Sequence, residues 1–249
     1  MQKERLASGG RGSGTSRAST IVLILALDEE RNIAEVLVDV AVHFPDSDVL
    51  VVDGESRDRT AEIARQHGAW VISVPNSLGH GGAMEAGLLF AREREYAYVI
   101  RVDSDGQHPT AEARRVLAVV ERGEADVAIG SRFVSVESTY KASKARRFAI
   151  HALSLLLLMI VGRRFRDITS GMVAMNANAI AHLCAVNRFE YSEIEALVIF
   201  LRSGFKVREI QVAMNPRQAG QSSFSVSRAF FYVFLGVLSL LLSVFTRAR

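Results

Sequence analysis

The chain has 249 residues, of which 49% are hydrophobic, enough for a sizeable core in one large domain or two small ones. A single cysteine, Cys184, excludes an internal disulfide framework and fits a reducing compartment. The formal net charge is +3, and four basic residues against one acidic residue within 1–19 account for all of it. The remainder is neutral, which argues against general nucleic-acid binding.

Residues 1–19 are rich in Gly, Ser and Arg, and they are predicted to form a disordered basic tail. An apolar run at 20–27 predicts a strand buried on both faces, and Asp28 behind it can cap a helix that ends near residue 43. Further strands are expected at 48–53, 70–74, 98–103 and 126–130, and further helices at 60–67, 79–94 and 111–122. This alternation predicts an α/β domain with an open, mostly parallel sheet and helices on both faces.

Acidic residues stand where the predicted strands end, namely Asp28, Asp53, Asp103 and Asp105. Ligands of open parallel sheets bind outside the carboxyl ends of the strands. Four acids on one edge are hard to explain as solvated turns alone. This edge is therefore the predicted functional site.

Asp103, Asp105 and Gln107 occupy alternate positions after an apolar strand. Residues two apart on an extended segment share a face, so their oxygens can point to one place. Three hard oxygen ligands suit Mg²⁺ or Mn²⁺, which keep positions open for substrate phosphates. A strand followed by an ordinary Asp/Gly turn is the alternative interpretation of this pattern. His108, beside this segment, is a candidate for substrate contact.

The second half of the chain contains two apolar segments with basic flanks. Seven basic residues and no acidic one lie between 141 and 166, around the apolar stretch 148–162. That stretch is shorter than the roughly 20 residues that cross a bilayer, so it is either an interfacial helix or a core helix. Residues 229–245 carry no charge and are expected to form a helix that lies in a membrane surface. A membrane span and an oligomer contact remain the alternatives for this helix.

Short motifs occur along the chain in a fixed order, at 25–30, 51–60, 103–109, 130–133, 167–171 and 217–222, with Glu195 before the last. With this ordered set the chain resembles the family 2 glycosyltransferases, inverting enzymes of the GT-A fold. Within them it is similar to the polyprenyl-phosphate sugar transferases of the dolichol-phosphate mannosyltransferase group. The resemblance covers about residues 21–223, so the predicted domains are the tail 1–19, a GT-A domain at 20–225 and the apolar helix at 226–249.

The resemblance implies a role for each matching position. The nucleoside would be held by Leu25, Leu27, Glu29 and Asp53, with Asp103 and Ser104 also at the nucleotide. The metal would be held by Asp103, Asp105 and Gln107, and the acceptor phosphate by Arg132, Arg146 and Arg217. Asp105 and Arg132 would be the catalytic residues. Glu195 would orient the acceptor region or only pair with an arginine, and His80 would lie near the donor diphosphate.

Several positions depart from the family pattern. His80 replaces a lysine, Ile150 and His151 replace Ser-Arg, Val173 replaces an arginine and Ser223 replaces a lysine. These changes lie on the diphosphate and acceptor sides, whereas the metal segment is intact. The departures therefore affect the acceptor more than the nucleotide donor.

The predicted reaction is metal-dependent transfer of a sugar from a GDP- or UDP-linked donor to a polyprenyl phosphate. A lipid monophosphate is mostly dianionic near neutral pH, so it needs little help from a general base. The expected location is the cytoplasmic face of a membrane, peripherally bound or shallowly anchored, with a possible homo-oligomer. A soluble acceptor, a non-catalytic partner of a membrane enzyme and, more weakly, a sugar nucleotidyltransferase are the alternatives.

Overall fold

A sheet of seven strands organises the part of the chain that the computed structural model describes, residues 18–132, 158, 162–163, 165–167, 170–186 and 193–215. The strand order is β3-β2-β1-β4-β6-β5-β7. The strands are β1 (Thr20–Ala26), β2 (Asp48–Asp53), β3 (Trp70–Ser73), β4 (Tyr98–Asp103), β5 (Val127–Ser131), β6 (Val173–Asn176) and β7 (Val207–Gln211). All neighbours pair in parallel except β6, which is antiparallel to β4 and β5. The predicted mostly parallel sheet is confirmed, while β6 and β7 were not predicted.

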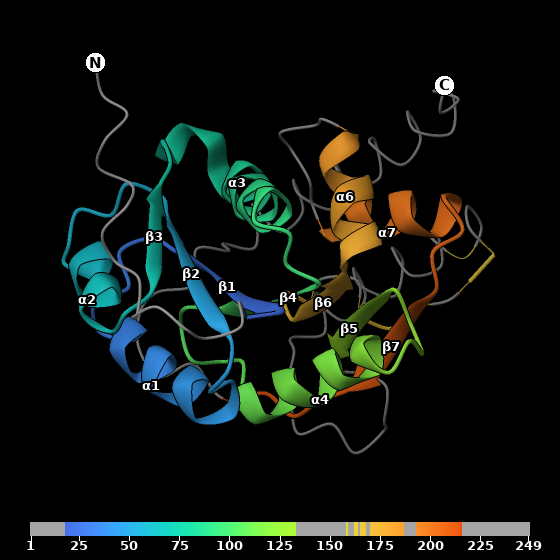
Figure 1. Ribbon diagram of the computed structural model, residues 1–249, viewed down its shortest axis with the longest axis horizontal. Helices are drawn as coiled ribbons and strands as arrows, with labels where there is room; N and C mark the ends of the chain where they lie inside the picture. The colour runs from blue at the N-terminus through green and yellow to red at the C-terminus, as the bar shows by residue number, and fades with distance from the viewer. Residues whose placement is uncertain are drawn as a thin grey trace, which may run out of the picture.

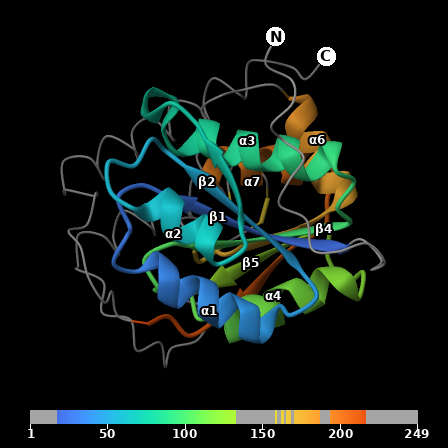
Figure 2. The ribbon, with the colours of Figure 1, turned by 60° about the vertical axis from the view of Figure 1, so that its left-hand side comes forward.

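Helices cover both faces of the sheet, as predicted (Figure 1). The helices α1 (Ile33–His43), α2 (Thr60–Gln66) and α4 (Thr110–Glu121) pack on one face. The other face carries α3 (Gly79–Glu93), which follows the short 3₁₀ helix η1 (Asn76–Leu78), together with α6 (Ala177–Ala185) and α7 (Glu193–Arg202). In the turned view of Figure 2 the sheet lies between α1 and α4 below and α3 and α6 above.

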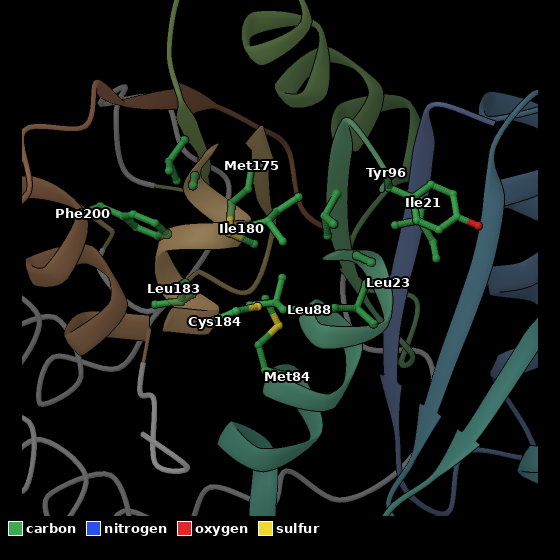
Figure 3. Packing of buried hydrophobic residues seen from close by; sticks show 14 of the residues in the cluster. Ile21, Leu23, Met84, Leu88, Tyr96, Met175, Ile180, Leu183, Cys184 and Phe200 are labelled. Atoms are coloured by element: carbon green, nitrogen blue, oxygen red, sulfur yellow. The ribbon is translucent and has the colours of Figure 1, made fainter. Parts of the chain in front are cut away.

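The hydrophobic core has two halves, one on each side of the sheet. Alternate residues of β1 serve both halves: Ile21 and Leu23 face α3, whereas Val22 and Ile24 face α1. Met84 and Leu88 of α3 pack beside Leu183 and Cys184 of α6 (Figure 3). The apolar run at 20–27 is thus a strand buried on both faces, as expected for a strand inside a parallel sheet.

The prediction that Asp28 caps the first helix is wrong. Helix α1 begins at Ile33 after Asn32, and the Asn32 side chain forms no cap hydrogen bond. Asp28 has a φ of 55° and is hydrogen-bonded to the loop after β2. Its Oδ1 accepts from the N–H of Arg57 at 2.7 Å, and its own N–H donates to Oγ of Ser56 at 2.9 Å. Asp28 therefore joins two loops at the edge of the sheet.

The predicted boundary of the N-terminal tail is slightly late. The carbonyl of Ser19 accepts hydrogen bonds from the N–H groups of Ala97 and Tyr98, and Ala18 packs against the core. Residues 1–17, most of the apolar segment 148–162 and the expected C-terminal helix at 226–249 lie outside the described residues. Among the helices that the structure describes, none is long and apolar enough to cross a membrane.

Gly87 allows α3 to approach β1 closely, because an added Cβ would lie 2.5 Å from Cδ1 of Leu23. We expect Gly87→Ala to lower the free energy of unfolding by up to about 2 kcal/mol. Overpacking costs about 1–3 kcal/mol, which exceeds the gain of about 1 kcal/mol in helix propensity. Urea denaturation measures the change. In a Leu23→Ala background the same substitution should be neutral or stabilising, and an equal loss in both backgrounds would contradict this account.

Candidate active site

Three adjacent strands bring the predicted site residues to one edge of the sheet. Ala26 of β1 is paired with Asp53 of β2, and Leu25 of β1 is paired with Asp103 of β4. Parallel strands end at the same edge, so residues far apart in sequence become neighbours there. The structure therefore gathers Leu25, Asp53 and Asp103, as the sequence predicts.

Asp53 lies at the end of β2 with only 3% of its surface exposed. Its Oδ2 accepts from the N–H of Ser56 at 3.3 Å, whereas its Oδ1 is buried without a hydrogen-bond partner. A buried acceptor without a partner is costly unless a ligand satisfies it. Leu27, 44% exposed, lies beside Gly54 next to this carboxylate. Both side chains are thus placed to meet a bound molecule.

Glu29 is held within the protein. Its N–H donates to Oγ1 of Thr60 at 2.8 Å, and its Oε2 accepts from Nδ2 of Asn32 at 2.6 Å. These contacts tie the residues before α1 to the start of α2. Ser104, also predicted at the nucleotide, is buried directly after β4. The nucleotide contacts of Glu29 and Ser104 remain predictions.

Asp105 and Gln107 lie against each other after β4. Oδ1 of Asp105 accepts from the backbone N–H of Gln107 at 3.1 Å, and its Oδ2 accepts from Nε2 of Gln107 at 2.5 Å. The amide nitrogen of Gln107, and not its oxygen, faces this carboxylate. Because the two ends of an amide exchange places by a half turn, the same position can offer an oxygen to a cation.

His108 supports Asp103 from behind and is itself buried, and its contact with substrate remains a prediction. Its Nδ1 accepts from the backbone N–H of Asp103 at 3.0 Å, and its Nε2 lies 3.3 Å from Oδ2 of the same residue. Nε2 therefore carries the ring proton and points at the carboxylate. Burial lowers the pKa of His108, which keeps the imidazole neutral. Burial also raises the pKa of Asp103, but its neighbours His108 and Arg101 outweigh this and lower it.

Arg101 and Glu193 are site residues that the sequence analysis missed. The guanidinium of Arg101 is buried, with Nη1 3.1 Å from Oε1 of Glu193 and Nη2 3.3 Å from Oδ1 of Asp103. Nε2 of His80 lies 3.3 Å from the same Oε1 of Glu193. Burial raises the pKa of Glu193, but the hydrogen bond to His80 and the charge of Arg101 hold it far below its usual range. An arginine inside the apolar strand at 98–103 was the sequence signal for this cluster.

Arg132 is fixed by a buried ion pair. Its Nε and Nη2 donate to the two carboxylate oxygens of Asp167 at 2.6 and 2.8 Å, and its backbone N–H donates to Oδ2 at 3.0 Å. Asp167 is fully buried, and its own N–H donates to Oε1 of Glu209 at 2.8 Å. The Nε–Nη2 edge of the guanidinium is therefore occupied by Asp167. Arg146 and Arg217, the other predicted phosphate ligands, lie outside the described residues.

The donor set around Asp103 fits a divalent cation in chemistry and in charge. Carboxylate and amide oxygens are the ligands that Mg²⁺ and Mn²⁺ prefer. The described ranges contain no cluster of three or more His, Cys, Asp or Glu side chains with metal-binding geometry. The predicted set of two carboxylates and one amide remains a prediction. The described side chains nearby leave an excess of negative charge, with Asp103, Asp105, Asp167 and Glu193 against Arg101 and Arg132. A divalent cation would neutralise this excess.

Comparison with known proteins assigns the family. The model of glycosyl transferase family 2 matches residues 21–194, and the chain belongs to this family. A polyprenol monophosphomannose synthase of Mycolicibacterium smegmatis is 29% identical over 90% of this chain and 88% of its own. An undecaprenyl-phosphate mannosyltransferase of Micrococcus luteus is 31% identical over 73% of this chain and 77% of its own. The protein is therefore a glycosyltransferase.

Solved structures show the same fold. A glucosyl-3-phosphoglycerate synthase from Mycobacterium tuberculosis, in complex with Mn²⁺, UDP and phosphoglyceric acid, matches with a TM-score of 0.68. Its identity is 18%, and the match covers 89% of this chain and 78% of that one. The same synthase with Mg²⁺ and UDP matches with a TM-score of 0.65 at 20% identity. The open sheet with its two helical layers is thus the fold of known nucleotide-sugar enzymes.

The lowered pKa of Glu193 predicts a loss of stability in acid. A carboxyl whose pKa is lower in the folded protein stabilises it above the unfolded pKa of about 4.3, and this contribution disappears as the pH falls. We expect the free energy of unfolding to fall below about pH 4.5 more steeply in the wild type than in Glu193→Gln. One proton limits the difference to about 1.4 kcal/mol per pH unit, reduced by the partial exposure of the carboxylate.

Urea denaturation across this pH range measures the two slopes. Glu35→Gln, at an exposed position on α1, serves as the matched control and should keep the slope of the wild type. Parallel curves for the wild type and Glu193→Gln would refute the assignment.

Proposed function

We propose that the protein transfers a sugar from a nucleoside-diphosphate sugar to a polyprenyl phosphate, with Mg²⁺ or Mn²⁺ and with inversion at the sugar. The names of the two relatives, which act on polyprenol and undecaprenyl phosphates, support the acceptor. The carboxylates Asp103 and Asp105, beside a nucleotide edge that contains Asp53, support the donor side. The observation that carries the proposal is the meeting of Asp53 and Asp103 at one edge of the sheet, where β1, β2 and β4 end.

A hydroxyl acceptor needs a general base whose pKa lies near the working pH. The pKa values of Asp103 and Glu193 are lowered, and a carboxylate with a low pKa is a weak base. His108 is buried behind Asp103, where it cannot reach an acceptor. A phosphate monoester is already mostly dianionic near neutral pH and needs no base. A phosphate oxygen can therefore act as the nucleophile without a base, whereas a hydroxyl acceptor would have to rely on His80 among the described residues.

Residues at different positions of the site have different roles in the proposed reaction. Asp53, Leu25, Leu27 and Glu29 hold the nucleoside at the ends of β1 and β2. Asp103, Asp105 and Gln107 hold the cation, which supplies positive charge to the leaving diphosphate. One acceptor phosphate oxygen forms a bond to the anomeric carbon while the bond from that carbon to the diphosphate oxygen breaks. The products are a nucleoside diphosphate and a polyprenyl-phosphate sugar, and no proton has to move.

The acceptor phosphate is assigned to Arg132, Arg146 and Arg217. Guanidinium groups bind phosphate oxygens through paired hydrogen bonds, and several around one dianion balance its charge. Asp167 holds the guanidinium of Arg132 in one orientation at the end of β5. Loss of Asp167 would therefore misplace Arg132 even though the charge of Arg132 remains.

We also propose that the protein works at the cytoplasmic face of a membrane, peripherally or shallowly anchored, because its acceptor is a lipid. The apolar segments with basic flanks at 148–162 and 229–245 support this location. Sedimentation with vesicles that contain anionic lipid should recover the full chain, with less recovery at high salt. Failure to bind such vesicles would contradict the proposed location.

A soluble phosphorylated metabolite is the second candidate acceptor. The solved relative of similar fold was crystallised with phosphoglyceric acid. On this side of the site, His80 is a half-exposed imidazole in contact with Glu193, an arrangement that suits a base for a hydroxyl acceptor. Transfer to a hydroxyl acceptor should then depend on His80, whereas transfer to a lipid phosphate should not need a base there.

Transfer assays with a panel of UDP- and GDP-linked sugars test the function. Each donor is incubated with Mn²⁺ or Mg²⁺ and with a short-chain polyprenyl phosphate, with phosphoglyceric acid, or with no acceptor. We expect product only with lipid phosphate and cation. We expect Asp105→Ala to lower the rate by about 100-fold or more, because a metal contributes several kcal/mol to stabilisation of the transition state.

Asp46→Ala is the matched control, since Asp46 is an exposed aspartate that precedes β2 at the opposite edge of the sheet. It should retain the rate of the wild type. Transfer to phosphoglyceric acid alone would replace the lipid acceptor with the soluble one. Tight binding of donor and cation without transfer to any acceptor would point to a non-catalytic role.

A further inference from the structure

Arg101 occupies an unusual position for a charged side chain. It lies inside β4, paired across the sheet with Leu23 of β1 and Val173 of β6, and only 5% of its surface is exposed. Because alternate residues of a strand share a face, it points with Val99 toward the layer of α3, α6 and α7. A charge buried among apolar residues is tolerated only when it is paired. The side chains that pair with Arg101 therefore indicate its role.

Those partners form a short chain of contacts that ends at the cation site. We call the four side chains His80, Glu193, Arg101 and Asp103 the Arg101 ladder. One oxygen of Glu193, Oε1, contacts both Nε2 of His80 and Nη1 of Arg101, and Nη2 of Arg101 contacts Oδ1 of Asp103. The ladder thus connects the start of α3, the first residue of α7 and the end of β4.

Gly171, which has no side chain, lies directly against Arg101 and Asp103. A Cβ added to Gly171 would lie 2.7 Å from Oδ1 of Asp103 and 2.8 Å from Nη2 of Arg101. Both contacts are too short for any side chain. The segment before β6 therefore packs directly against the Arg101–Asp103 pair, and the pair has little freedom to adopt another geometry.

We propose that Arg101 and Glu193 are positioning residues for the Asp103 carboxylate, which makes cation binding depend on how α7 is docked. Arg101 holds Oδ1 of Asp103 while His108 holds Oδ2, so the carboxylate keeps one orientation toward the cation. Glu193 balances the charge of Arg101, which would otherwise compete with the cation for Asp103. This inference rests on the proposed function, because it needs the cation at Asp103 and Asp105.

Two variants distinguish the orientation of Asp103 by Arg101 from the balance of charge by Glu193. Glu193→Gln leaves the charge of Arg101 unbalanced beside the cation site, so we expect weaker Mn²⁺ binding. The double variant Arg101→Met/Glu193→Gln keeps the net charge of the wild type but removes the group that holds Oδ1 of Asp103. If Arg101 served only as a structural ion pair with Glu193, this charge-neutral replacement would leave Mn²⁺ binding unchanged.

The experiment measures the Kd for Mn²⁺ by electron paramagnetic resonance, on the full chain and without a nucleotide sugar. We expect both the double variant and Glu193→Gln to raise the Kd about 10-fold or more, the usual effect of removing a group that orients a metal ligand. The matched control is Arg114→Met/Glu121→Gln, which removes an ion pair of α4 at 2.6 Å that is not part of the ladder. It should bind Mn²⁺ as the wild type does.

Gly171→Ala gives a second measurement if the double variant does not fold. It adds one methyl group between Asp103 and Arg101 and changes no charge. A Kd within twofold of the wild type, in the double variant or in a folded Gly171→Ala, would overturn the inference and leave the proposed function intact. A wild type that binds no Mn²⁺ would overturn both. Weaker Mn²⁺ binding in the variants, with no sugar transfer by the wild type, would support the ladder and contradict the proposed function.

Discussion

The pairing of buried arginines with distant carboxylates determines how the second half of the chain meets the sheet. Arg101 of β4 pairs with Glu193, 92 residues further along, and Arg132 after β5 pairs with Asp167, 35 residues further along. Each guanidinium is buried, so the loss of its carboxylate partner would leave an unpaired buried charge at a large cost. These two contacts place α7 and the segment before β6 beside the acidic edge. The geometry of the candidate site follows from that placement.

Local patterns in the sequence were enough to predict the first half of the fold. The apolar run at 20–27 identifies a strand buried on both faces, and the alternation up to residue 130 identifies an open parallel sheet. The same reasoning placed Asp53 and Asp103 at one edge, because the ends of parallel strands must meet there. The prediction succeeded because each of these features depends on neighbours in sequence or on a general rule of topology.

The features that the sequence did not predict depend on contacts between distant segments. Strand β6 has four residues, Val173–Asn176, and no alternation distinguishes it from a loop. Its antiparallel place between β4 and β5 arises only once the sheet exists. The resemblance pointed to Glu195, whereas Glu193, at the start of the same helix, is the residue that contacts Arg101 in the structure. Asp28 was predicted to cap a helix because it stands between an apolar strand and a helical segment. Its hydrogen bond to Arg57 joins segments 29 residues apart, and no local pattern indicates such a bond.

The charges and pKa values of the site residues limit the possible reactions more than the residue types alone do. The pKa of Asp103 is lowered by His108 and Arg101, and the pKa of Glu193 is lowered by His80 and Arg101, so both carboxylates remain anions across the neutral range. An anionic edge that cannot accept protons is a poor place to activate a hydroxyl, but it is a suitable place to hold a divalent cation against a diphosphate. In the proposed reaction the nucleophile is a phosphate oxygen that is already charged, and Arg132, held by Asp167, is one of the groups assigned to it. The proposed cation ligands and this arginine would then act on the two phosphates between which the sugar is transferred.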